Sequence, residues 1–64
     1  MKVFIWTGVL RDYTDGMAVG YGETLEEVLA LFPDHIADAL GVPTTVIDCD
    51  THTTPVSEYV YGGG

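Results

Sequence analysis

Hydrophobic residues recur at helical spacing in one central stretch of the chain, residues 24–32 (T-L-E-E-V-L-A-L-F). Its apolar positions, spaced i, i+3, i+4 and i+7, form one stripe along a helix: Leu25, Val28, Leu29 and Phe32. Thr24 is a favourable N-cap, and Glu27, three residues later, completes a capping box. We therefore predict a helix that begins after Thr24 and packs its apolar stripe against the rest of the fold.

A proline interrupts the helical pattern directly after this stretch. Pro33 has no N–H to donate, and its ring disfavours helical geometry at Phe32. The apolar spacing then resumes, with Asp34 as a new N-cap and Gly41 as the residue that ends the helix. The sequence thus predicts a kinked or broken helix whose second part is short.

Alternating apolar residues predict two strands before the helical region and two after it. The four ranges are residues 3–10, 17–22, 44–49 and 56–61. Between the first two, residues 11–16 form a hairpin loop with Asp15-Gly16 as the turn signal. One face of the second strand carries only Ala18, Gly20 and Gly22, which would let the helix approach closely.

This order of elements predicts an α+β fold of one domain. The crossover through the helices makes the third strand parallel to the second and places it beside the first, and a hairpin then adds the fourth. The result is a four-stranded antiparallel sheet in the order 2-1-3-4 with the broken helix on one face. Residues 1–61 form the domain, and glycines 62–64 form a flexible tail.

The first predicted strand is apolar on both faces, so it needs cover on both. One helical layer covers only one face. A chain of 64 residues buries about 60% of its unfolded surface, and its single cysteine cannot form an internal disulfide. Small domains of this kind often gain stability by association. We therefore predict a homodimer with Phe4 and Trp6 at its interface.

Acidic charge dominates the composition: ten Asp and Glu face two cations, Lys2 and Arg11, for a net charge of −8. This charge argues against direct binding to nucleic acid or to an anionic membrane. It favours a basic protein or nucleoprotein partner, with simple solubility as the alternative explanation. The predicted contact residues are Asp12, Tyr13 and Asp15 in the hairpin loop. Four further residues add to the negative electrostatic field that attracts the partner: Asp34, Asp38, Asp48 and Asp50.

Two groups of side chains could carry chemistry. The first would alternate on one face of an extended strand and could ligate a divalent metal, unless it is simply a solvated edge: Asp48, Asp50 and His52. The second pairs Cys49 with His35 or His52 as nucleophile and base. Cys49 alternates with Ile47, however, and is predicted to face the core as a small hydrophobe. We predict no catalytic residue, no cofactor and a protein that is not an enzyme.

No apolar run approaches the roughly 18 residues of a transmembrane helix. Residues 1–10 contain a short apolar run, but Trp6, Thr7 and Gly8 interrupt it and no small-residue cleavage site follows. We therefore expect no signal peptide and a cytoplasmic location.

The end of the chain carries a family resemblance. A strand–strand–helix–strand–strand chain that ends in Gly63-Gly64 resembles the ubiquitin-like β-grasp sulfur carriers. The resemblance implies that the exposed terminal glycine, Gly64, is activated as an adenylate or thiocarboxylate. The chain departs from that family at Gly62, where an apolar residue is usual, and in lacking an acidic-glycine turn before the last strand.

The chain as a whole is similar in type to the small inhibitor proteins encoded by phages, anti-CRISPR proteins among them. Short length, acidic charge and the lack of an enzyme motif carry this resemblance. It implies an inhibitor that occupies a basic, nucleic-acid-binding surface of a partner such as a host defence complex. The sequence thus predicts a non-enzymatic acidic protein-binding module, with a β-grasp carrier as the alternative and a small metal-binding protein as the third possibility.

Overall fold

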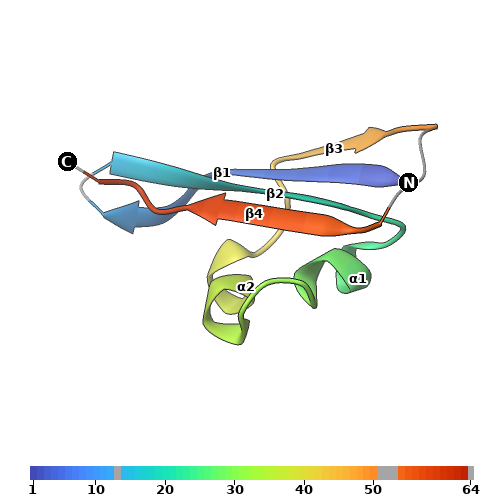
Figure 1. Cartoon of the computed structure of the whole chain (residues 1–64). Coiled ribbons are helices and arrows are strands. Elements are labelled where there is room, and N and C mark those ends of the chain that lie inside the picture. Colours follow the sequence, from blue (N-terminus) through green and yellow to red (C-terminus); the bar gives the residue numbers. More distant parts are fainter. Residues whose placement is uncertain (13, 51–53, 64) are drawn as a thin grey trace.

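A computed structural model describes residues 1–12, 14–50 and 54–63, and within them a four-stranded sheet carries two short helices on one face (Figure 1). The elements in chain order are β1 (Lys2–Asp12), β2 (Thr14–Gly22), α1 (Leu25–Leu29), α2 (Asp34–Leu40), β3 (Thr45–Asp48) and β4 (Val56–Val60). All strand pairs are antiparallel. The predicted α+β class is confirmed.

The strand order is β3-β1-β2-β4, so β1 and β2 are central. The interior position of the first strand and the antiparallel placement of the third beside it are confirmed. The predicted order 2-1-3-4 is wrong, because β4 pairs with β2 instead of β3. β3 ends at Asp48 and β4 begins at Val56, so the connection is longer than a tight hairpin and can reach the far edge.

The hairpin between β1 and β2 is longer than predicted. Asp12 pairs with Thr14, so both strands extend well into the predicted loop, and Asp15-Gly16 lies inside β2 instead of forming the turn. Gly16 has a different role, since a Cβ at this position would overlap the carbonyl oxygen of Val60. The glycine that looked like a turn signal therefore lets the chain after β4 approach β2.

Two irregularities bend β1 toward its end. The register with β2 shifts between Thr7 and Val9 and again between Val9 and Asp12. Each shift contains a residue of positive φ, Gly8 at 68° and Leu10 at 53°. Positive φ is ordinary for glycine and uncommon for leucine. Because each bulge inserts an extra residue, strict alternation fails here, and both Val9 and Leu10 contact the core.

The core lies between the helices and one face of the sheet. Its buried side chains are Phe4, Trp6, Leu10, Ala18, Val28, Phe32, Ile36 and Leu40. The ring of Trp6 meets that of Phe32 edge-on, with 5.7 Å between centroids. The Trp6 Nε1–H donates to the Gly41 carbonyl oxygen at 2.9 Å. This hydrogen bond satisfies the buried indole and ties the end of α2 to β1.

The burial of Phe4 and Trp6 changes the predicted dimer contact. These side chains are only 4% and 0% exposed beneath the helices, so they cannot contact a second copy while the fold is intact. The alternate residues Val3 and Ile5 lie on the other face of β1. Both faces of this strand are apolar, and the sequence pattern does not reveal which one the helices cover.

The Thr24 half of the predicted capping box is confirmed. The Thr24 Oγ1 accepts from the Glu27 backbone N–H at 3.2 Å. The helix itself ends at Leu29, and Phe32 follows in a turn whose N–H donates to the Leu29 carbonyl. Phe32 remains in the core despite lying outside the helix.

Pro33 separates the helices, as predicted, but it is also the N-cap of α2, so Asp34 is the first helical residue instead of the cap. The Pro33 carbonyl accepts the first two helical hydrogen bonds, which needs no N–H from proline. Gly41 ends α2 with a φ of 67°. Within the described ranges, neither helix has the length and apolar content that a bilayer crossing requires.

The small face of β2 lies against α1. A Cβ on Gly20 would overlap Val28 Cγ1, and a Cβ on Gly22 would lie 2.8 Å from Val28 Cγ2. The predicted close approach is confirmed, and the Val28 side chain fills the space that the glycines leave.

Gly62 and Gly63 are fixed against the hairpin. The Gly62 N–H donates to the Leu10 carbonyl at 3.0 Å. The Gly63 N–H donates to the Thr14 Oγ1, and the Thr14 hydroxyl donates to the Gly63 carbonyl, both at 2.9 Å. The prediction of a flexible tail is therefore wrong for these two glycines, because β1 binds the Gly62 backbone through Leu10 and β2 binds the Gly63 backbone through Thr14. Gly64 lies outside the described residues.

Candidate interaction surface

The sheet face opposite the helices is uncovered and mostly apolar. Directly paired residues share a face, and Phe4, Trp6 and Ala18 are on the helix side, so the alternate positions lie on the other side. Across the four strands these positions form three rows: Ile47, Val3, Tyr21 and Val56; Thr45, Ile5, Val19 and Glu58; Thr7, Met17 and Val60. We call these residues the open face.

Apolar side chains at the perimeter of the open face are accessible to solvent. Met17 is 44% exposed, Ile47 47%, Val56 54% and Val60 56%. Residues toward its centre, such as Ile5 and Val19, are half-buried. A contiguous exposed apolar surface of this kind is a mark of an interaction site. The sequence identified its strands but assigned the exposed contact to the wrong side of β1.

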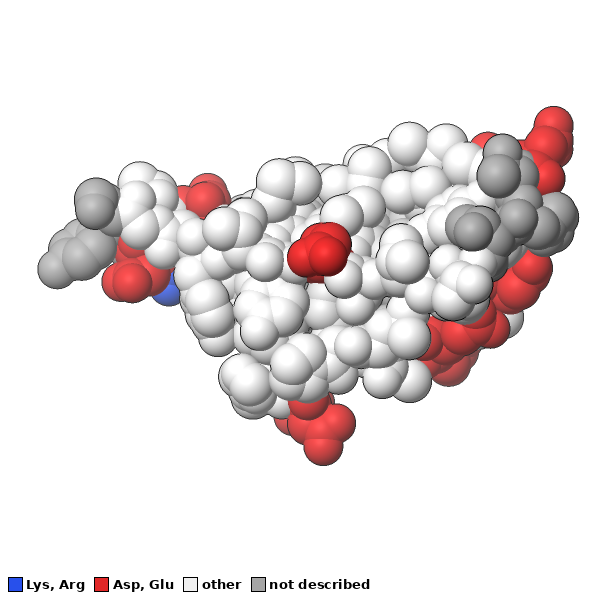
Figure 2. All heavy atoms as spheres, in the orientation of Figure 1, with Lys and Arg blue, Asp and Glu red and all other residues white. Residues whose placement is uncertain are grey.

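Acidic residues surround a broad uncharged surface. Figure 2 shows Asp and Glu at both ends of the molecule and along its lower margin, with one acidic residue isolated among uncharged atoms between them. Glu58 is the carboxylate of the open face and lies across from Val19. No hydrogen bond or ion pair joins the Glu58 side chain to another residue in the part of the chain that the structure describes.

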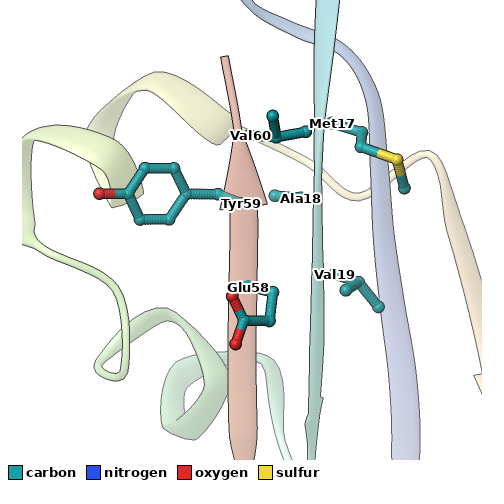
Figure 3. Close-up of a pocket in the computed structure, with 6 residues that line it drawn as sticks. All are labelled: Met17, Ala18, Val19, Glu58, Tyr59 and Val60. Carbon is teal, nitrogen blue, oxygen red and sulfur yellow. The ribbon is translucent and has the colours of Figure 1, made fainter.

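A shallow depression of about 280 Å³ follows the β2–β4 ladder. It is lined by Met17, Ala18, Val19, Glu58, Tyr59 and Val60 (Figure 3). In this view the Tyr59 ring points toward the helices, whereas Met17 and Val19 point the opposite way. Pockets for small ligands commonly measure about 300–1,000 Å³ and are more enclosed. The depression therefore suits one long side chain of a partner.

Aromatic rings continue from the core to the β4 edge. The Phe32 and Tyr59 centroids are 6.2 Å apart, and those of Tyr59 and Tyr61 are 6.1 Å apart. Tyr59 is 40% exposed and Tyr61 52%. Tyr59 and Tyr61 are thus held in place by ring contacts while part of each side chain stays accessible.

The predicted acidic contact residues are exposed but lie in three separate places. They occupy the hairpin end (Asp12, Asp15), the α2 helix (Asp34, Asp38) and the opposite end of the sheet (Asp48, Asp50). Arg11 Nε lies 2.7 Å from Asp15 Oδ1, which offsets part of the hairpin charge. Tyr13 lies outside the described residues.

The predicted metal set lies partly outside the described residues. His52 lies outside the described residues, and among those described no group of three or more His, Cys, Asp and Glu could hold a metal ion. Asp48 is the last residue of β3, opposite Lys2, and Asp50 follows beyond the strand.

Cys49 does not face the core. Its N–H donates to the Met1 carbonyl at 2.8 Å, which extends the β1–β3 ladder by one pair. By this alternation Cys49 shares the side of Ile47, on the open face, and is half-buried. The predicted core position is wrong because the register turns the other set of β3 side chains toward the helix side. His35, on α2, is on the opposite side of the sheet, so the two do not form a nucleophile–base pair.

Tyr21 is the group on the open face whose ionisation is perturbed. Partial burial raises the pKa of its phenol above the usual value, and the ionised forms of Cys49 and Glu23 raise it further. The phenol therefore stays protonated at neutral pH and adds no charge to this surface.

Comparison of the chain with protein-family models, with curated proteins and with solved structures finds no match.

Proposed function

We propose that this chain is a non-enzymatic protein-binding module that holds a basic partner against its open face. The exposed apolar surface carries the proposal, because four of its side chains remain at least 44% accessible in a fold that already has a core. Apolar surface supplies the affinity of such contacts. Surrounding charge selects the partner and speeds the encounter.

Charge favours a basic protein over a second copy of the chain. A face-to-face dimer would bring together two molecules of net charge −8, each with Glu58 on its open face. Like charges across an interface cost free energy, whereas a basic partner gains from the same arrangement. The homodimer predicted from sequence would have to use the open face and offset this repulsion.

More specifically, we propose that the chain inhibits a nucleic-acid-binding protein. The molecule is 36 Å long, and carboxylates lie at both of its ends. A surface that binds nucleic acid presents Lys and Arg along a comparable length to reach successive phosphates. Acidic groups spaced along this protein would form ion pairs with those Lys and Arg side chains and so block the nucleic acid. The carrier alternative gains no support, because Gly62 is buried and the Gly63 backbone is bound to Thr14.

Matched lysine substitutions test the proposal. Val60→Lys places a cation on the open face, and Val42→Lys makes the same change of charge at a residue that is 88% exposed outside the sheet. We expect wild type and Val42→Lys to capture the same basic protein from a lysate of the source organism or its host, and high salt to release it. Val60→Lys should lose it.

Ile47→Lys, on the opposite edge of the open face, should lose the partner as well. Circular dichroism would verify that each variant is folded. If both open-face variants retain the captured protein as well as Val42→Lys does, the open face is not the binding surface.

A further inference from the structure

The outer backbone edge of β4 is unpaired within the described residues. β4 pairs with β2 on one side, and within the described residues no hydrogen bond joins its other backbone edge to any segment. Natural edge strands are usually guarded by lysine, proline, a bulge or a covering segment. Val56–Val60 contains neither lysine nor proline and pairs with β2 without a register shift. This edge is therefore open to another strand.

The side chains of β4 favour such pairing. Val56 and Val60 are 54% and 56% exposed and flank Glu58 on the open face. Tyr59, 40% exposed, lies on the other side of the strand. β-Branched and aromatic residues stabilise a strand through contacts with the neighbouring strand. An added strand would thus find apolar contacts on either side of one carboxylate.

A second copy of the chain does not suit this edge. The antiparallel two-fold arrangement that pairs all five residues of β4 places Glu58 opposite Glu58 of the other copy. Like charges directly opposite each other on a sheet are destabilising. Glu58 therefore disfavours self-pairing and favours a strand with a cation at the same position.

We propose that β4 receives an extended segment of the partner by strand addition, with a Lys or Arg opposite Glu58 and apolar residues two positions to either side, against Val56 and Val60. The depression along β2–β4 lies beside Glu58 and has an otherwise apolar lining. The aliphatic part of the Lys or Arg side chain packs between the added strand and β4, and its charged end meets the Glu58 carboxylate at the rim of this depression. The inference rests on the proposed function and specifies how that partner is recognised.

Synthetic peptides test this inference without a known partner. The probe is the acetylated, amidated peptide S-V-T-R-T-V-S, and its matched control is S-V-T-E-T-V-S. A third peptide repeats the first with alternate backbone nitrogens methylated, which removes its ability to pair as a strand. Each is titrated into the isotope-labelled full chain and followed by NMR amide shifts.

We expect the arginine peptide to shift amides of β4 and to bind about tenfold more tightly than the glutamate peptide. Glu58→Lys should reverse this preference. Glu26→Lys, the same change at an exposed residue on α1, should leave the preference intact. The methylated peptide should not bind.

Equal binding of the two peptides, shifts confined to other strands, or no shifts at millimolar peptide would overturn the inference. Capture of the partner separates this inference from the proposed function. If Ile47→Lys abolishes capture of a basic protein while Glu58→Lys does not, the open face binds the partner and strand addition at β4 is wrong.

Discussion

Gly20 sets the distance between α1 and the sheet. A Cβ at this position would overlap Val28 Cγ1, so Gly20→Ala forces the helix outward or strains the Val28 rotamer. Overpacking of this kind costs about 1–3 kcal/mol of unfolding free energy. Urea denaturation should show that loss, and Val28→Ala in the same chain should recover part of it. If the losses of unfolding free energy in Gly20→Ala and Val28→Ala simply add in the double mutant, the two residues are not in contact.

Local patterns identified residues whose roles depend on close neighbours. Thr24 was recognised as a cap because its partner, Glu27, is three residues away. Gly16 was wrongly predicted to form the turn. A glycine is needed there because the Val60 carbonyl, far away in sequence, lies too close for a Cβ. Trp6 was recognised as a residue needing cover, but the pattern contains nothing that says which face of β1 the helices would take.

The segment after β4 gives a prediction at the scale of elements. A Cβ on Gly62 would overlap the Thr14 carbonyl oxygen, whereas nothing lies within 4 Å of a Cβ on Gly63. Gly62→Ala should therefore lower the free energy of unfolding by about 1–3 kcal/mol. Gly63→Ala should change it by less than about 0.5 kcal/mol.

Chemical denaturation of the two variants provides the comparison, with wild type alongside. If Gly62→Ala is as stable as Gly63→Ala, then Gly62 is not packed against the hairpin in solution.

The sequence predicted which segments are helices and strands more readily than it predicted which strands pair. Helical and strand spacings located the strands and the break at Pro33 to within a few residues. They did not predict that β4 joins β2, because the alternating valines of β4 suit either edge and its connection to β3 permits both. The bulges at Gly8 and Leu10 were missed as well, since positive φ at a leucine has no local signal.

Charge acts on the molecule as a whole. Ten carboxylates on 64 residues repel one another in the compact state, and two cations offset little of this. Raising sodium chloride from about 0.05 M to about 0.5 M screens that repulsion and should raise the Tm. The variant Glu26→Gln/Asp38→Asn, which removes two exposed carboxylates, should show a smaller rise. A Tm that falls with salt in both proteins would contradict this explanation.

The candidate surface could be predicted only in part. Net charge and the doubly apolar first strand indicated an acidic protein with an exposed hydrophobic face. The open face itself depends on the register that aligns Ile47, Val3, Tyr21 and Val56, and on the helices lying against the other side. Both are set by contacts between segments far apart in sequence.

The strand order also determines how the molecule responds to mechanical force. Met1 lies at one end of the sheet and Gly63 beside Thr14 at the other (Figure 1). Pulling these residues apart drags β1 and β4 in opposite directions along β2, which lies between them. Hydrogen bonds perpendicular to the pull share the load and must fail together. The chain should resist stretching along this axis far more strongly than peeling of β3 or β4 from its edge.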